Sequence, residues 1–118
     1  MALPNLKNPT YIYGKTGRYA VTATLATALA APGTGKTFKI NSIFCANVDG
    51  INPADISVSI YDGSTDRWLA FTIRVPADAT QIISTKETYF YLGEGDSIRA
   101  VANAAGDLEL IIGYEDIS

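Results

Sequence analysis

Residues 89–100, which read Tyr-Phe-Tyr-Leu-Gly-Glu-Gly-Asp-Ser-Ile-Arg-Ala, decide the fold of this chain. An aromatic run with high β propensity leads into a short segment with two glycines, and a second apolar run follows it. Gly93 and Gly95 are both predicted to take positive φ, which residues with a Cβ adopt at a cost in free energy. The stretch therefore predicts a tight structural turn that sets the register of the two strands beside it.

Alternating apolar and polar residues predict further strands on both sides of this turn. Residues 37–47, 56–61 and 97–102 are three of them. In the last strand, one face is predicted to hold Leu108, Leu110, Ile112 and Tyr114. In an earlier strand, one face is predicted to hold Leu69, Phe71, Ile73 and Val75, and the other Trp68, Thr72 and Arg74.

About eight candidate strands follow one another at turn spacings of about 8–12 residues, which is typical of sandwiches and barrels. Residues 19–31 fit a helical stripe as well as a strand, but their threonines and the following Pro32-Gly33 favour a bent strand. We therefore predict an all-β chain, with an antiparallel, jelly-roll-like β-sandwich over residues 18–118.

Residues 1–17 are predicted to form an extended N-terminal arm, because Pro4 and Pro9 push the residues before them toward extended backbone. The arm carries more apolar surface than a free arm would keep. Its apolar side chains include Leu3, Leu6, Tyr11, Ile12 and Tyr13. Two arrangements would bury them: the arm folds back on its own domain as a strand, or it lies on a neighbouring subunit.

The 118 residues carry a net charge of −3, and this balance argues against nucleic-acid binding, which needs a basic surface. Residues 1–48 hold five basic and no acidic residues, whereas residues 49–118 hold four basic and all twelve acidic ones. Chance together with turn-forming aspartates would explain this division. Head-to-tail attraction between copies of the chain, or docking of the basic half on an acidic neighbour, would explain it as well. No apolar run approaches the roughly 20 residues that cross a bilayer, so we expect no membrane association.

The sequence has no histidine and a single cysteine, Cys45, in an apolar run that predicts a buried thiol. Residues 32–37 resemble part of a phosphate-binding loop, but Ala30 stands where that motif needs glycine, and a strand-like run follows. Asp62 and Asp66 share a loop that lacks the spacing of a calcium site. We expect no catalytic residues, no metal site and no cofactor.

Four aromatic residues form a further candidate site. They are Tyr61, Trp68, Tyr89 and Tyr91. Aromatic side chains on the polar-facing side of strands are common at subunit interfaces. The same residues would also serve ordinary cross-strand packing, or form a platform for a sugar. Together with the apolar residues of the arm, they make up the candidate interface.

Several stretches resemble small virion structural proteins of tailed bacteriophages. Residues 8–15 look like the entry arm of such proteins, residues 38–47 like their first core strand, and residues 75–80 like a recurring loop. Residues 91–98 resemble their most recognisable turn, and residues 113–117 also fit. The resemblance covers most of the chain and rests on strands and turns, not on catalytic residues.

The resemblance implies a non-enzymatic virion protein, made in the host cytoplasm and built in multiple copies into the capsid, neck or tail. Such a protein would be a decoration (cement) protein or an adaptor. The resemblance also implies a homo-oligomer, for example a trimer, bound to other virion proteins. The alternative, left open by the aromatic residues, is a carbohydrate- or receptor-binding β-sandwich module, which would be a monomer with an exposed cleft at Trp68.

Overall fold

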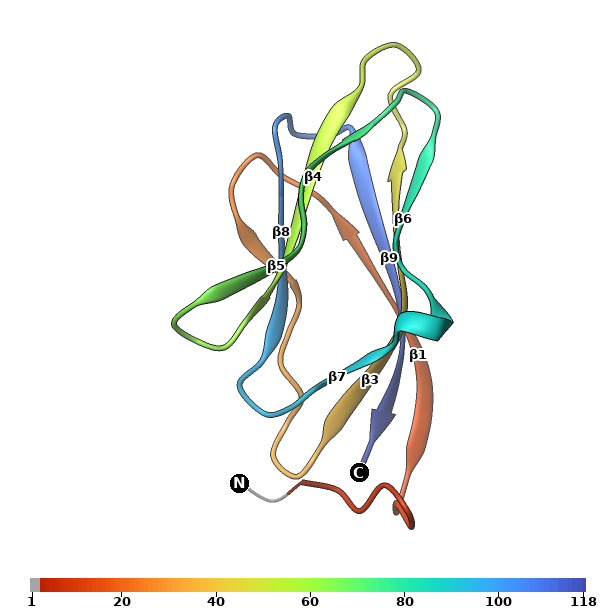
Figure 1. Ribbon diagram of the computed structural model, residues 1–118, viewed down its shortest axis with the longest axis vertical. Coiled ribbons are helices and arrows are strands. Elements are labelled where there is room, and N and C mark those ends of the chain that lie inside the picture. The colour runs from red at the N-terminus through yellow and green to blue at the C-terminus, as the bar shows by residue number, and fades with distance from the viewer. Residues whose placement is uncertain (1–2) are drawn as a thin grey trace.

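The computed structural model describes residues 3–118, and within them the chain forms nine β-strands and one short 3-10 helix (Figure 1). The first four strands are β1 (Ile12–Ala20), β2 (Ala26–Leu29), β3 (Thr37–Asn47) and β4 (Ala54–Tyr61). The others are β5 (Asp66–Val75), β6 (Thr80–Ser84), β7 (Phe90–Leu92), β8 (Ser97–Ala102) and β9 (Leu108–Ile117). The 3-10 helix η1 (Lys86–Thr88) joins β6 to β7. The prediction of an all-β chain is confirmed.

The strands form two antiparallel sheets that pack face to face. Sheet A has the order β1-β9-β3-β6, and β7 also pairs with β3. Sheet B has the order β2-β8-β4-β5. Within the described residues, the chain crosses from one sheet to the other at every connection except β4–β5 and β6–β7. This is the strand order of a jelly roll, so the predicted jelly-roll-like sandwich is confirmed.

The core lies between the sheets and is built from alternate residues of the central strands. Its fully buried side chains include Ile40, Ile43, Ile56, Val58, Ile98 and Leu110. The predicted inner face of β9 is confirmed, because Leu108, Leu110 and Ile112 are all buried. Tyr114, further along the same strand, packs on the ring of Phe38 at a centroid distance of 4.8 Å.

The segment predicted as an arm over residues 1–17 is divided in the structure. β1 pairs with β9 without interruption, from Ile12 opposite Ile117 to Ala20 opposite Glu109. The sandwich therefore starts at Ile12 and not at residue 18, because β1 satisfies the backbone groups along one whole edge of β9. Residues 3–11 form the segment before the sheet, and Met1 and Ala2 lie outside the described residues.

The turn at residues 93–96 is closed by a hydrogen bond from the Asp96 amide to the Gly93 carbonyl at 3.1 Å. Gly95 has a φ of +85°, as predicted, whereas the φ of Gly93 is not positive, so that half of the prediction is wrong. The predicted role in strand register is also wrong, because β7 pairs with β3 in sheet A and β8 pairs with β2 and β4 in sheet B. The turn instead carries the chain from one sheet to the other.

A turn at residues 33–36 packs against this one. Its Gly35 has a φ of +73°, and the Gly35 amide donates a hydrogen bond to the Glu94 carboxylate at 2.7 Å. The hydroxyl of Thr37, the next residue after the turn, donates to the Leu92 carbonyl at 2.7 Å. The stretch that resembles a phosphate-binding loop is thus a β-turn that leads into β3, as the strand-like run after it predicted.

We predict that Gly95→Ala lowers the free energy of unfolding by about 1 kcal/mol, because alanine must then adopt the left-handed backbone conformation. Gly93→Ala is the matched control in the same turn, since its new Cβ would lie 3.7 Å from the nearest atom, Asp96 Oδ2, at an ordinary φ. Urea unfolding followed by circular dichroism measures both variants. Equal stability of the two would contradict the turn conformation assigned to Gly95.

Candidate interaction surfaces

An exposed apolar surface follows β5, which forms one edge of sheet B. Its members, which we call the β5 surface, are Trp68, Leu69, Phe71 and Ile73. Phe71 is 63% exposed and Trp68 42% exposed, whereas Val75 at the end of the strand is fully buried. An edge strand also leaves a row of backbone N–H and C=O groups unpaired. The β5 surface therefore combines apolar side chains with free hydrogen-bonding groups.

Irregular pairing explains why the alternation predicted for this strand is wrong. The register of the β4–β5 ladder shifts on both sides of Val58. Thr72 has a φ of +52°, and its amide donates to the Ser57 hydroxyl at 2.9 Å. Because a bulge interrupts the alternation of faces, Trp68 and Phe71 meet with ring centroids 5.0 Å apart, although they were predicted on opposite faces.

Tyr61 lies beside the β5 surface but is engaged within the chain. The Arg99 guanidinium lies over its ring, 4.1 Å from the centroid, and its hydroxyl donates to the Gly63 carbonyl at 2.9 Å. Arg99 Nε lies 3.5 Å from the Asp66 carboxylate, which accepts a hydrogen bond from the buried Ser59 hydroxyl at 2.7 Å. These contacts fix Tyr61 as part of a polar network on sheet B.

Tyr89 and Tyr91 lie on sheet A, at the strand that pairs with β3. Their rings meet edge to face with centroids 5.9 Å apart, and both side chains are nearly half exposed. The Lys39 ammonium lies 4.4 Å from the centroid of the Tyr89 ring and 3.9 Å from the Glu115 carboxylate. The four candidate aromatic residues are thus divided between two sheets and do not form a single platform.

The segment before β1, residues 3–11, crosses the end of the sandwich where β9 ends (Figure 1). Leu3, Pro4 and Leu6 of this segment line a hollow of about 150 Å³, whose other walls are Thr37 and Tyr91. The segment therefore contacts its own domain. Even so, Leu3 remains 67% exposed and Leu6 51% exposed, so this contact leaves much of their apolar surface open to solvent.

The remaining candidates from the predicted arm are Tyr11, Ile12 and Tyr13, each 54% exposed. The rings of Tyr11 and Tyr13 stack with centroids 5.6 Å apart. The Tyr11 amide donates to the Ser118 carbonyl, and the Ser118 amide donates to the Tyr11 carbonyl, both at 3.0 Å. Backbone pairing fixes these residues in place, and their side chains stay exposed at the edge of sheet A.

The uneven charge of the sequence is partly matched within the fold. β9, from the acidic part, lies between β1 and β3, from the basic part. Lys15 Nζ lies 2.9 Å from the Asp116 carboxylate, and this hydrogen bond raises the pKa of Lys15. Lys39 approaches Glu115 from the other side of β9. Two of the five basic residues in the first part of the chain therefore form ion pairs with acidic residues of the second part.

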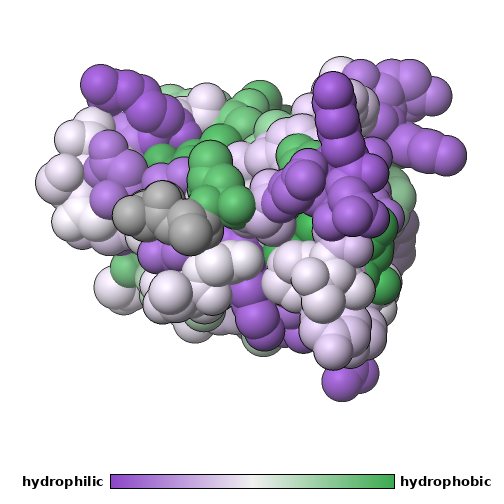
Figure 2. Space-filling model, turned by 90° about the horizontal axis from the view of Figure 1, so that it is seen from below, coloured by the Kyte–Doolittle hydropathy of each residue, from purple (hydrophilic) through white to green (hydrophobic). Residues whose placement is uncertain are grey.

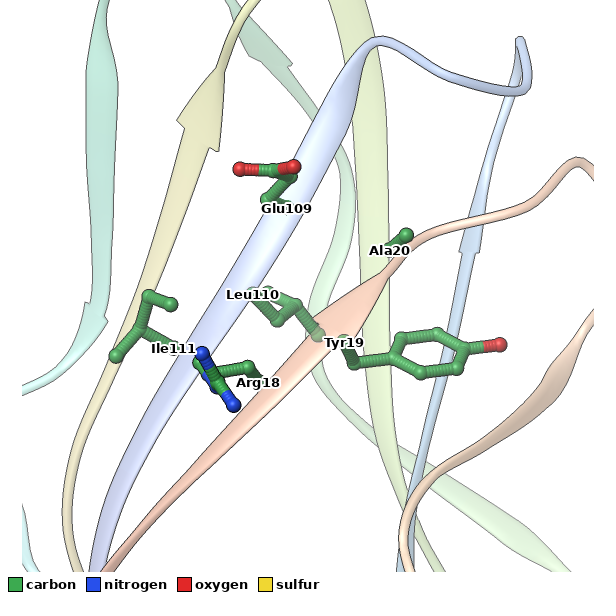
Figure 3. Close-up of a pocket in the computed structure, with 6 residues that line it drawn as sticks. All are labelled: Arg18, Tyr19, Ala20, Glu109, Leu110 and Ile111. Carbon is green, nitrogen blue, oxygen red and sulfur yellow. The ribbon is translucent and has the colours of Figure 1, made fainter.

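A larger hollow, of about 460 Å³, lies along β1 and β9 (Figure 3). Its lining residues are Arg18, Tyr19, Ala20, Glu109, Leu110 and Ile111. Figure 3 shows the Tyr19 side chain directed away from those of Arg18 and Glu109. A single guanidinium and a single carboxylate, without a nucleophile or a second acid beside them, do not make a catalytic arrangement. We therefore assign no chemistry to this hollow.

Several carboxylates of the described residues act in turns and ion pairs. Asp62 accepts hydrogen bonds from the amides of Thr65 at 2.8 Å and Ser64 at 2.9 Å, and these bonds lower its pKa. Across residues 3–118, no three His, Cys, Asp or Glu side chains are grouped as a metal ion would require. Over the same range, the structure has no helix with the length and apolar character needed to cross a membrane.

Several exposed apolar residues were not identified from the sequence, among them Phe44, Val48, Ile51 and Ile82. Phe44 and Ile82 are cross-strand partners in sheet A, and Ile51 is 85% exposed in the β3–β4 loop. Nothing in the alternation separates Phe44 and Ile82 from core residues. For Ile51 a signal was present, because Gly50 before it and an Asn-Pro pair after it mark a turn.

Searches against protein-family models and against curated proteins find no match to this chain. Solved structures share its fold. A chain from the work "Bacillus endospore appendages form a novel family of disulfide-linked pili" is 16% identical, with a TM-score of 0.55 over 92% of this chain and 87% of that one. A chain from the acidic stable capsid of Helicobacter pylori bacteriophage KHP30 is 12% identical, with a TM-score of 0.53 over 94% and 90%.

A third similar structure, from the Gx strain of infectious bursal disease virus, is 14% identical with a TM-score of 0.50. It covers 91% of this chain but only 31% of the viral one. Identities this low show a common fold and nothing further about function. This chain therefore shares its fold with chains from two viral structures and from a pilus.

We predict that the Cys45 thiol of the folded protein does not react with a thiol-specific disulfide reagent near pH 8. The side chain is fully buried, and burial raises its pKa to about 11. The unfolded thiol ionises near pH 8.5, so stability should fall as the pH rises from about 9 toward 11. Full reaction in denaturant is the control, and rapid reaction of the native protein would contradict the burial of Cys45.

Proposed function

We propose that this chain is a non-enzymatic structural protein of a tailed-bacteriophage virion, assembled in multiple copies on the capsid, neck or tail. It serves there as a decoration protein or as an adaptor, after synthesis in the host cytoplasm, and it contacts both its own copies and other virion proteins. The phage-like stretches of the sequence support this proposal. The jelly-roll fold shared with a chain of the KHP30 bacteriophage capsid is consistent with it.

The observation that carries the proposal is the β5 surface. Trp68 and Phe71 form an exposed aromatic pair on an open sheet edge. Full burial of one such side chain contributes about 1.5–3 kcal/mol, and aromatic residues are enriched among those that dominate binding energy. An exposed apolar edge strand is also an aggregation hazard for a free monomer. The β5 surface is therefore best explained as a contact that assembly covers.

The cysteine content favours non-covalent assembly. The Bacillus appendages are described as disulfide-linked pili. This sequence has a single cysteine, Cys45, and it is fully buried between the sheets. A disulfide between two copies would require local unfolding of β3 in both. Contacts through apolar side chains and sheet edges need no such change.

A second candidate function, a carbohydrate- or receptor-binding module, is favoured by one group on sheet A. Tyr89 and Tyr91 are half exposed, with Lys39 beside them. Asn41 donates to the Glu115 carboxylate at 3.2 Å and adds polar groups nearby. Aromatic rings next to convergent polar groups suit a sugar ligand. This group lies on the other sheet from the β5 surface, so the two functions are tested by different variants.

We predict that Phe71→Ser weakens self-association of the protein by about tenfold or more, the effect of losing one buried aromatic contact. Phe44→Ser is the matched control, because Phe44 is an exposed phenylalanine on the opposite sheet. Sedimentation velocity over a concentration series measures both variants. Unchanged self-association of Phe71→Ser, with Phe44→Ser as the damaging change, would show that β5 is not the contact.

Two further measurements separate the candidate functions. Antibody labelling of particles of the phage that encodes the chain should place it on the virion, and its absence from washed particles would contradict the proposal. On a glycan array, the virion proposal predicts no selective binding. Binding that is lost in Tyr91→Ala and kept in Phe71→Ser would favour the carbohydrate-binding function instead.

A further inference from the structure

The two ends of the molecule differ in character. The sandwich is 48 Å long, and in Figure 1 the β3–β4 loop forms one tip while residues 3–11 and the turn at residues 33–36 form the opposite end. One tip carries an exposed apolar side chain surrounded by acids. The other carries an apolar hollow, and two of the residues that line it have a lysine next to them in the sequence.

The β3–β4 loop, residues 48–53, holds its apolar side chains out from the body. Ile51 is 85% exposed and Val48 is 54% exposed. The loop itself is rigidly held: the Asp49 carboxylate accepts hydrogen bonds from the Ile51 amide at 2.8 Å and the Asn52 amide at 3.2 Å. The side chain of the buried Asn47 also holds the loop, because its amide donates a hydrogen bond to the Asn52 carbonyl at 3.0 Å.

A fixed loop with an exposed isoleucine is suited to binding, because little conformational entropy remains to be lost when the side chain is buried. Folding does not explain the isoleucine, since it contributes almost no buried area to the core. We call Ile51 with its loop the Ile51 knob. An apolar side chain presented in this way would be buried by an apolar hollow of similar size on a partner.

The surroundings of the Ile51 knob are acidic. Asp49 lies in the knob itself, and its carbonyl accepts a hydrogen bond from the Asp78 amide of the neighbouring loop at 3.2 Å. The Asp107 carbonyl accepts one from the Val48 amide at 2.8 Å. The three loops at this tip, residues 48–53, 76–79 and 103–107, contain no lysine or arginine. The hollow that receives the knob should therefore have basic residues beside it.

The opposite end of the same chain has such a hollow, which we call the terminal hollow. Its lining residues are Leu3, Pro4, Leu6, Thr37 and Tyr91, and its volume is about 150 Å³. A cavity of that size admits a six-carbon ring, so it has room for the four-carbon side chain of isoleucine. Figure 2 looks at this end and shows apolar side chains in the middle of the face, between hydrophilic ones.

Two lysines are chain neighbours of residues that line the terminal hollow: Lys7 follows Leu6, and Lys36 precedes Thr37. Both are exposed, and among residues 3–118 neither has a carboxylate within 4.0 Å. The acids of this end are engaged inside the chain. Asp116 and Glu115 pair with Lys15 and Lys39, Glu94 accepts from the Gly35 amide, and Asp96 accepts from the Gly93 amide.

We infer that the partner of the Ile51 knob is a second copy of this chain, with the knob of one copy inserted into the terminal hollow of the next. The knob and the hollow are different surfaces, so the contact is head to tail, and such a contact propagates into a filament or closes into a ring. The acidic tip meets the two unpaired lysines. This inference rests on the proposed function, because it assigns one of the contacts through which the subunit assembles.

The first experiment substitutes the knob. Ile51→Ser should weaken association between copies by about tenfold or more and leave the melting temperature unchanged, because the side chain is exposed in the folded subunit. Ile82→Ser is the matched control, an exposed isoleucine at neither tip. Raising the salt concentration should weaken the wild-type contact, since its charges lie at the surface. Association that Ile51→Ser leaves intact would overturn the inference.

The second experiment tests which two surfaces of the subunits meet. Protein with Ile51→Cys is mixed with protein carrying Leu6→Cys under mild oxidation, and the native Cys45 stays buried and unreactive. A head-to-tail contact predicts a mixed disulfide-linked dimer, with little dimer from either variant alone. Dimers of Ile51→Cys with itself would indicate a knob-to-knob contact and overturn the inference.

The outcomes also separate this inference from the proposed function. Wild-type protein that assembles while the mixed dimer is absent overturns the head-to-tail contact alone, and Phe71→Ser then tests the β5 surface independently. A wild-type protein that stays monomeric up to about millimolar concentration, where even weak contacts between copies are populated, overturns the head-to-tail contact between copies. Particle labelling then decides whether the chain is still a virion component.

Discussion

Strand β9 (Leu108–Ile117) forms backbone ladders with β1 on one side and β3 on the other, and the rest of the structure depends on these two pairings. Alternate residues of β9 enter the core, while Asp116 and Glu115 meet lysines on the neighbouring strands. The pairing joins the first strand of the chain to the last. It thereby brings residues 3–11 and Ser118 to the same end of the sandwich, and leaves the acidic loops at the other.

The edges of the two sheets differ in a way that bears on assembly. β1 pairs in an unbroken register and carries Lys15 and Arg18, and charged side chains keep an open edge from aggregating. Tyr11, Ile12 and Tyr13 are nevertheless exposed where this edge begins. β5 carries bulges, which also protect edges, yet it exposes Trp68 and Phe71. Bulges there turn the aromatic side chains together and outward. An exposed aromatic cluster on an open edge supports the proposal that a partner covers β5.

Strand β5 runs along the side of the sandwich, whereas the β3–β4 loop and residues 3–11 lie at its two ends (Figure 1). Contacts through the side extend an assembly across the long axis, and contacts between tips extend it along that axis. The two proposed contacts, used together, would build a two-dimensional array of subunits. An array of this kind is what a capsid layer or the wall of a tube requires, and neither contact needs a disulfide.

The sequence by itself determined the local features of this protein. Alternation located β3 and β8 at their observed bounds, identified the buried face of β9, and placed Cys45 in the core, because each depends only on neighbouring residues. It also identified the turn at Gly95, since positive φ there needs glycine. Only the tertiary structure decided which strands pair, that β1 reaches back to Ile12, and that β5 is an exposed, bulged edge. Those features depend on contacts between residues far apart in the chain, and periodicity carries no information about them.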